Sequence, residues 1–195
     1  MKFNNILLIA GTGTKSGKTT MACRIIEQIR HPELVAIKIT PHFHETTPGL
    51  APIYEGEGYS VYKENNPGTT KDTSRMLKAG ASQVFFAKVT DETLPMAFDK
   101  IMEQIAGIPP IICESPAARY YVDPGLFIIT SSNSVIKQKD INSLLRLSHV
   151  TFTMEEIEKR TTIPISFNKG KWIYETHMID PNHNRPRISG GAQRS

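Results

Sequence analysis

The chain has 195 residues and a mass of 21.8 kDa, which is typical of one well-buried domain. Its 39% hydrophobic and 22% charged residues, with 13 Gly and 13 Pro, exclude a disordered, collagen-like or coiled-coil chain. The formal charge of +4 is modest, and the Lys and Arg residues are too scattered to form a nucleic-acid-binding stripe. We therefore expect a globular protein with no nucleic-acid partner.

No apolar run approaches the roughly 18 residues of a membrane-spanning helix, and the first apolar segment is too short for a signal peptide. Cys23 and Cys113 lack the spacing of a disulfide framework or a cysteine zinc site. These features predict a cytoplasmic protein with no membrane partner. We expect one domain over residues 1–179 and a polar, flexible tail over residues 180–195.

The first elements form a strand, helix and strand unit. Residues 5–10 are a short continuous apolar run before Gly11, typical of a strand buried on both faces of a parallel sheet. Residues 18–30 carry apolar side chains at helical spacing, and residues 34–39 form a second apolar strand. This unit has the size of a right-handed crossover. Residues 41–70, rich in Pro, Gly, Thr and Asn, are expected to be a long functional or partly mobile loop.

The alternation continues to about residue 168. Predicted helices span residues 73–79, 91–106, 139–147 and 154–160, and predicted strands span residues 82–89, 111–114, 126–130, 149–153 and 163–168. Asp123-Pro124-Gly125 is expected to be a turn, and the pattern dissolves after Lys171. Alternating strands and helices predict a three-layer α/β/α fold with a mostly parallel sheet.

The strongest chemical signal is the segment GTGTKSGKTT, residues 11–20, between the first strand and the first helix. A phosphate-binding loop needs glycines, a lysine for the β and γ phosphates and a hydroxyl for the metal, beside a helix N-terminus. The strict pattern has Gly at the position of Thr12, whereas here Gly11 comes one residue earlier. The expected nucleotide-binding residues are Gly13, Thr14, Lys15, Ser16, Gly17, Lys18, Thr19 and Thr20.

Two features of this loop leave alternatives. Lys15 is either an additional phosphate contact or a solvated charge at the loop tip. Mg²⁺ would bridge phosphate oxygens with Thr19 and a carboxylate at a neighbouring strand end. Glu114 directly follows a buried run, at the sheet edge where ligands bind in α/β folds, and its alternative is a solvent-facing side chain. Cys113 is expected to fill the core rather than act as a nucleophile.

The segments that follow the loop resemble a known family. KITPHFHE at residues 38–45, Pro67-Gly68, and KDTSRMLKAGA at residues 71–81 have the order and spacing of MobB-like GTP-binding adapters of molybdopterin-guanine dinucleotide biosynthesis. The resemblance implies a P-loop NTPase fold, a bound nucleotide with Mg²⁺, a homodimer and a protein partner in cofactor biosynthesis. By the same resemblance, Gly13, Lys18 and Thr19 hold phosphate and metal, Glu114 serves the metal or its water, and Asp72 points into the site.

Several of these residues also have simpler roles. Asp72 precedes a predicted helix and could serve as its N-cap. Lys38, at a strand end, is either a phosphate or substrate contact or a solvated charge. His42 and His44 could bind a metal or an anionic pterin, although two surface histidines are the simpler interpretation.

Other observations keep a ligase and either nucleotide open. After Glu114 the chain reads Ser-Pro-Ala-Ala-Arg where MobB-like proteins commonly carry Gly-Phe-Lys. The loop is also similar to that of dethiobiotin synthetase, in which Lys38 would stabilise a carboxyphosphate-like anion. The acidic residue expected at Gly13 or Lys15 is missing, as is Gly-Ala-Gly-Gly after Glu114. Asn168-Lys169 resembles a guanine-reading loop but lacks the following Asp, so ATP and GTP both remain candidates.

The sequence therefore predicts a nucleoside triphosphate-binding protein with weak or partner-stimulated hydrolysis. In hydrolysis, Lys18 and Mg²⁺ on Thr19 would offset charge on the γ phosphate, and Asp72 or Glu114 would orient water. The alternatives are an ATP-dependent ligase of the dethiobiotin synthetase type and a nucleotide-switched interaction module whose 41–70 loop docks a partner.

Overall fold

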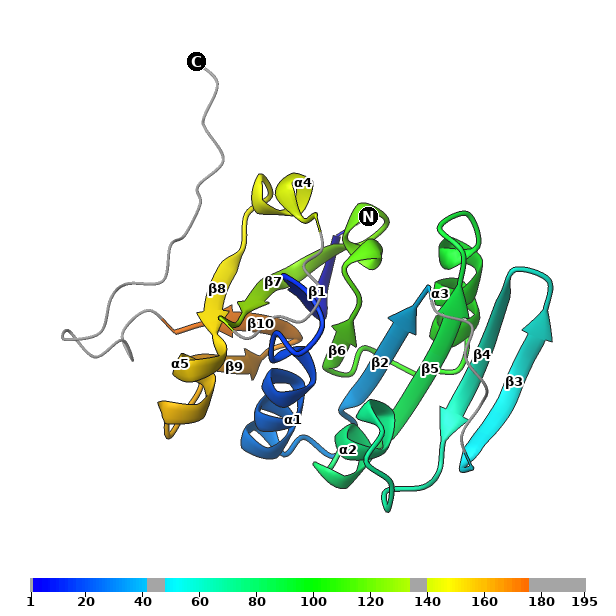
Figure 1. Cartoon of the computed structure of the whole chain (residues 1–195). Coiled ribbons are helices and arrows are strands. Elements are labelled where there is room, and N and C mark those ends of the chain that lie inside the picture. Colours follow the sequence, from blue (N-terminus) through cyan, green and yellow to red (C-terminus); the bar gives the residue numbers. More distant parts are fainter. Residues whose placement is uncertain (1, 42–47, 134–139, 176–195) are drawn as a thin grey trace.

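The structure is a computed structural model that describes residues 2–41, 48–133 and 140–175. Eight strands form one sheet in the order β3-β4-β5-β2-β6-β1-β7-β8 (Figure 1). The strands are β1 (Lys2–Gly11), β2 (Val35–Thr40), β3 (Leu50–Gly56), β4 (Tyr59–Glu64), β5 (Gln83–Val89), β6 (Ile111–Glu114), β7 (Asp123–Ser131) and β8 (Val150–Thr153). Every pairing from β5 to β8 along this order is parallel, whereas β3 and β4 run antiparallel.

Helices cover both faces of the sheet, so the fold is a three-layer α/β/α arrangement, as predicted. The helices are α1 (Lys18–Ile29), α2 (Asp72–Lys78), α3 (Leu94–Met102), α4 (Asn142–Leu145) and α5 (Met154–Lys159), with a 3₁₀ turn, η1 (Ala117–Tyr120). Alternate residues of β1 enter two separate cores, one containing α1, α2 and α5 and the other α3, α4 and η1. Figure 1 shows α1 and α2 in front of the sheet.

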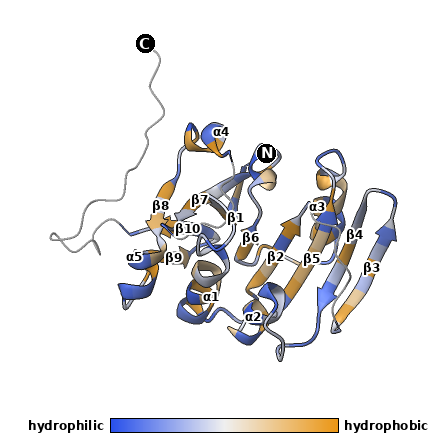
Figure 2. Cartoon of the chain, in the orientation of Figure 1, coloured by the Kyte–Doolittle hydropathy of each residue, from blue (hydrophilic) through white to orange (hydrophobic). Residues whose placement is uncertain are grey.

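The central strands are apolar because both of their faces are covered. Ile6 and Leu8 of β1 are fully buried on the α3 face, and Leu7 and Ile9 are fully buried on the α1 face. Figure 2 shows hydrophobic residues along the strands and hydrophilic residues on the outer turns of the helices. The predicted strand of residues 5–10 is confirmed, and β1 begins three residues earlier, at Lys2.

The expected long loop over residues 41–70 is wrong over residues 50–64. Residues Leu50–Gly56 and Tyr59–Glu64 form the hairpin β3–β4, which extends the sheet because β4 pairs antiparallel with β5. A tight turn closes the hairpin at Gly58, whose φ is +78°. Pro, Gly and polar residues obscured the strand pattern, because strand formation here depends on packing Tyr59 and Val61 into the α3 core.

The last predicted strand forms, but it does not join the main sheet. β9 (Ile165–Asn168) pairs antiparallel with β10 (Lys171–Tyr174), and β10 lies where the sequence pattern was expected to dissolve. This hairpin packs against the α1 core through Trp172, whose Nε1 donates a hydrogen bond to the Asn5 carbonyl at 2.8 Å. The hairpin therefore covers β1 and β7 on the same face of the sheet as α1.

Other boundaries differ from the predictions. Asp123-Pro124-Gly125 is the start of β7 rather than a turn, because Asp123 and Pro124 pair with Lys2 and Phe3 of β1. The backbone of Asn4 approaches Gly125 so closely that a Cβ there would lie 2.2 Å from the Asn4 carbonyl oxygen. The helix predicted over residues 91–106 shortens to α3. Of the predicted helix 139–147, residue 139 lies outside the described residues and the rest contains α4. Residues 176–195 also lie outside them, including the expected boundary at 179/180.

The helices carry no membrane-crossing candidate: within the described ranges, none is both long and apolar enough to span a bilayer.

Candidate functional site

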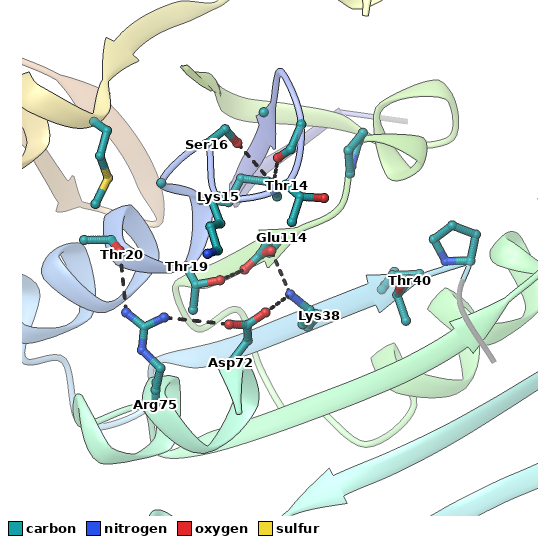
Figure 3. A pocket seen from close by; sticks show the side chains of 18 residues that line it. Thr14, Lys15, Ser16, Thr19, Thr20, Lys38, Thr40, Asp72, Arg75 and Glu114 are labelled. Carbon is teal, nitrogen blue, oxygen red and sulfur yellow. Dashed lines mark hydrogen bonds and ion pairs between the residues drawn. The ribbon is translucent and has the colours of Figure 1, made fainter. Parts of the chain in front are cut away.

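A pocket of about 570 Å³ opens at the carboxyl ends of β1, β2 and β6, in front of the N-terminus of α1 (Figure 3). Ligands bind at this edge in parallel α/β sheets because the loops there diverge to either face. The pocket is lined by Gly11, Gly13, Thr14, Lys15, Ser16, Gly17, Lys18, Thr19, Thr20, Lys38, Ile39, Thr40, Pro41, Asp72, Arg75, Glu114, Pro116 and Met154.

The loop between β1 and α1 is tight at Gly11 and Gly17. A Cβ at Gly11 would lie 2.1 Å from Ser16 Oγ and 2.9 Å from Thr130 Oγ1, so only glycine fits there. Gly17 has a φ of +92° and is the N-cap of α1. As a glycine it offers the first helical amides no side-chain acceptor. Gly11 thus gives the close approach that the strict motif assigns to the position of Thr12.

Lys18 folds over this loop. Its Nζ donates hydrogen bonds to the Gly13 carbonyl at 2.8 Å and to Ser16 Oγ at 3.2 Å. The ammonium therefore lies at the centre of the loop, beside the positive end of α1. A helix N-terminus with a lysine at its mouth favours an anionic ligand.

Behind the loop, four side chains from four elements form one hydrogen-bonded network (Figure 3). Thr19 Oγ1 of α1 donates to Glu114 Oε2 of β6 at 2.8 Å. Lys38 Nζ of β2 donates to Glu114 Oε1 at 2.8 Å and to Asp72 Oδ2 of α2. Glu114 is only 3% exposed, and both of its carboxylate oxygens accept hydrogen bonds from these protein groups. The network joins the start of α1, just after the β1–α1 loop, to the neighbouring strands.

The network fixes the charge of its members. Burial by itself would lower the pKa of Lys38, but the carboxylates of Glu114 and Asp72 outweigh it and raise that pKa above its usual value. Burial would likewise raise the pKa of Asp72, yet the Lys38 ammonium and Arg75 hold it below its usual value. At neutral pH, Lys38 is therefore a cation and Asp72 an anion.

Arg75 extends the site across α2. Its guanidinium lies 3.7 Å from Asp72 Oδ1 and donates to Thr20 Oγ1 at 3.5 Å. Lys15, Lys18, Lys38 and Arg75 supply four positive charges to the lining and Asp72 and Glu114 supply two negative charges, which leaves a net charge of +2. This balance suits a polyanion better than a neutral ligand.

The protein oxygen atoms of the pocket can hold Mg²⁺ only if a bound ligand supplies further oxygen atoms. Thr19 and Glu114 present hard oxygen atoms, which Mg²⁺ prefers, and Asp72 adds a second carboxylate nearby. Throughout residues 2–41, 48–133 and 140–175, however, no group of three or more His, Cys, Asp or Glu side chains could hold a metal. Phosphate oxygens and waters would have to complete the coordination, as is usual for Mg²⁺.

The structure brings most of the residues expected from the sequence into this pocket. The loop residues Gly13 to Thr20 line it together with Lys38, Asp72 and Glu114. Lys15 is exposed at the loop tip, with a φ of +62°. The N-cap role expected for Asp72 is wrong, because Lys71 is the N-cap of α2 and Asp72 turns to Lys38. Glu114 does not face solvent.

Asn168 does not reach the pocket. It is exposed at the β9–β10 turn, and the adjacent Phe167 packs edge-on against His31 with ring centroids 5.9 Å apart, just beyond the C-terminal end of α1. This is the end of α1 opposite the β1–α1 loop. His42 and His44 lie outside the described residues.

Cys113 is buried in the α3 core, as predicted, and burial raises the pKa of its thiol above the usual value. A buried thiol with a raised pKa is a poor nucleophile.

Among the lining or supporting residues that sequence reasoning did not assign to the site are Arg75, Thr130 and Met154. Arg75 lies one helical turn after Asp72, so the i, i+3 spacing could have linked the two. Thr130 lies near the end of β7, and its Oγ1 is hydrogen-bonded to Ser16 Oγ at 3.5 Å. The Thr130 carbonyl accepts a hydrogen bond from the Thr12 amide at 3.0 Å. Met154 of α5 lies against Gly17. Neither Thr130 nor Met154 carries a sequence signal, since each depends on strand order.

Comparison of the chain with models of protein families, with curated proteins and with solved structures finds no match. The fold and the geometry of this pocket are therefore the observations on which a function must be argued.

Proposed function

We propose that the protein binds a nucleoside triphosphate with Mg²⁺ at the loop of residues 11–20 and hydrolyses it slowly or only when a partner stimulates it. One observation carries the proposal: the loop closes around the Lys18 ammonium at the N-terminus of α1, while Thr19 is hydrogen-bonded to Glu114 beside it. These parts match the needs of a triphosphate, which are a cation, free helical amides and oxygen donors for the metal.

In this proposal, the loop amides and Lys18 bind the β and γ phosphates, and Arg75 lies within the same pocket to offset further charge. Thr19 and Glu114 hold Mg²⁺, which supplies charge neutralisation on the phosphate oxygens. Asp72 and Glu114 orient water or fix the position of Lys38.

Slow intrinsic hydrolysis follows from the state of the two carboxylates. Both Asp72 and Glu114 are bonded to the Lys38 ammonium, and the pKa of Asp72 is lowered. A carboxylate whose pKa is depressed by a neighbouring cation is a weak general base. This supports slow hydrolysis, as in the adapter-like role that the MobB-like resemblance implies. The homodimer and the protein partner in cofactor biosynthesis are proposed from that resemblance alone. The free thiols of Cys23 and Cys113 are in keeping with a cytoplasmic protein.

Binding measurements test the proposal directly. ATP, GTP and their diphosphates are titrated with and without Mg²⁺ into the native chain and into Lys18→Ala, with Lys100→Ala as control. Lys100 lies on α3 and pairs with Glu103 on the surface, outside the pocket lining. We expect Lys18→Ala to weaken triphosphate binding at least about tenfold, since each 1.4 kcal/mol of lost contact is a factor of ten. Equal affinity in native and Lys18→Ala chains would refute the proposal.

A ligase of the dethiobiotin synthetase type is the second candidate. It is favoured by the extension of the pocket past the loop to Lys38, Thr40 and Pro41, which leaves room beside the phosphates for a second substrate. It is disfavoured by the pairing of Lys38 with two carboxylates, because a substrate anion carrying a single charge must compete with both of them for the ammonium. Product formed only when ATP and a small acid or amine are both present would favour the ligase over the adapter.

A further inference from the structure

The place that a cation would take between Asp72 and Glu114 is filled by an ammonium of the protein itself. Lys38 lies on β2 in register with Glu114 of the adjacent parallel strand β6, and Asp72 faces both from α2. The Lys38 Nζ is 2.8 Å from Glu114 Oε1 and is also hydrogen-bonded to Asp72 Oδ2 (Figure 3). One positive charge thus bridges two negative charges.

The carboxylate oxygens held by Lys38 belong to the donor set that Mg²⁺ needs. The remaining oxygen of Glu114 accepts a hydrogen bond from Thr19 Oγ1 at 2.8 Å, so the proposed metal-binding hydroxyl is also engaged. The side chains of Lys38 and Glu114 are only 18% and 4% exposed. Little water can replace Lys38 there, and an unpaired carboxylate at this depth would be unfavourable.

We propose that Lys38 is an internal counter-ion that keeps divalent cations away from Asp72 and Glu114 until a polyphosphate arrives, so that the metal enters together with its nucleotide. The polyphosphate adds oxygen ligands for the metal and negative charge for Lys38, which can then turn from the carboxylates toward the phosphates. This inference rests on the proposed function for its last step only. The exclusion of metal from the empty pocket is a property of the three side chains alone.

The inference gives Lys38 a positioning role that a purely structural ion pair would not have. If the pairing with Lys38 does not limit the metal affinity of Asp72 and Glu114, its removal should lower stability and leave that affinity unchanged. If it excludes cations, its removal leaves two carboxylates beside Thr19 with no positive charge between them. Without the ammonium charge between them, the two carboxylates attract a divalent ion more strongly than they do in the native chain.

Mn²⁺ binding to the full chain without nucleotide tests this, with Mn²⁺ replacing Mg²⁺ as a paramagnetic probe. The measurement is the free Mn²⁺ signal in a titration of native protein, Lys38→Met and Lys100→Met. We expect Lys38→Met to bind one Mn²⁺ at least about tenfold more tightly than the native chain, the lower range for a nearby opposite charge. Lys100→Met removes the same charge from the surface pair with Glu103, so it should match the native chain.

Two further variants identify the site. Lys38→Arg keeps the positive charge and should keep metal affinity low. The double variant Lys38→Met with Glu114→Gln should lose the gained Mn²⁺ binding, because a neutral amide is a weak ligand. Circular dichroism of each variant checks that it is folded.

The proposal is overturned if folded Lys38→Met binds Mn²⁺ no more tightly than the native chain, or if the gain persists after Glu114→Gln. Tight Mn²⁺ binding by the native chain without nucleotide would overturn it as well, and this arm needs no variant to fold. None of these outcomes involves nucleotide, so they are distinct from failure of the proposed function, which Lys18→Ala reports.

Discussion

Replacing Gly11 by alanine tests whether the loop geometry holds the site together. The added Cβ would lie 2.1 Å from Ser16 Oγ and 2.9 Å from both Lys18 Cγ and Thr130 Oγ1. Contacts below 3.0 Å cannot persist, so the loop or its partners must move. Ser16 is fully buried and bonded to Lys18, and its displacement would carry the ammonium with it.

The expected cost has two parts. Overpacking a tight site destabilises by about 1–3 kcal/mol. Alanine also lowers the conformational entropy of the unfolded chain, which offsets about 0.4–1 kcal/mol of this loss in stability. A net loss of about 1–2 kcal/mol corresponds to a Tm lowered by roughly 2–8 °C for a protein of this size. Triphosphate affinity should fall at least about tenfold, because a misplaced Lys18 loses its phosphate contacts.

Thermal unfolding followed by circular dichroism and nucleotide titration measure the two effects. Gly68→Ala is the matched control, because its Cβ would meet only Asn66 Oδ1, at 3.1 Å, on an exposed turn. Adding Ser16→Ala to Gly11→Ala removes the 2.1 Å contact and should recover part of the lost stability. A Gly11→Ala protein with native Tm and native nucleotide affinity would refute the assignment of Gly11 to the close approach within the loop.

Two further predictions concern stability. The pKa of Asp72 is lowered and that of Lys38 is raised, so their ion pair contributes fully to stability between about pH 5 and pH 9. This contribution declines as pH falls below the usual Asp value of 3.8. It is lost as pH rises through the raised pKa of Lys38, above 10.5. The difference in unfolding free energy between native and Lys38→Met, measured in urea, should therefore shrink in acid, and a difference that grows in acid contradicts the pairing. Trp172→Phe removes the 2.8 Å hydrogen bond to the Asn5 carbonyl and should cost about 1–3 kcal/mol in the same assay, whereas an unchanged midpoint would mean that the β9–β10 hairpin contributes nothing through this contact.

Much of the fold could be predicted because buried parallel strands read as continuous apolar runs. Residues 5–10, 34–39 and 111–114 needed no tertiary information, since strands covered on both faces have one composition throughout. The β3–β4 hairpin could not be predicted in the same way. Pro52, Gly56 and Gly58 obscure its pattern, and its Tyr and Val residues become strand-forming only against α3.

The candidate site also has one part that local sequence predicts and one part that depends on the order of the strands. The amino-acid sequence by itself determined the loop of residues 11–20 as the candidate site, because its glycines, Lys18 and Thr19 lie within ten residues of one another, where local geometry alone brings them together. Only the tertiary structure decided what surrounds that loop. Strand order places β6 between β1 and β2, and this order joins Thr19, Glu114, Lys38 and Asp72 across as many as 95 residues while leaving Asn168 at the far end of α1. Such pairings depend on which strands become neighbours, and side-chain chemistry along the chain does not encode that choice locally.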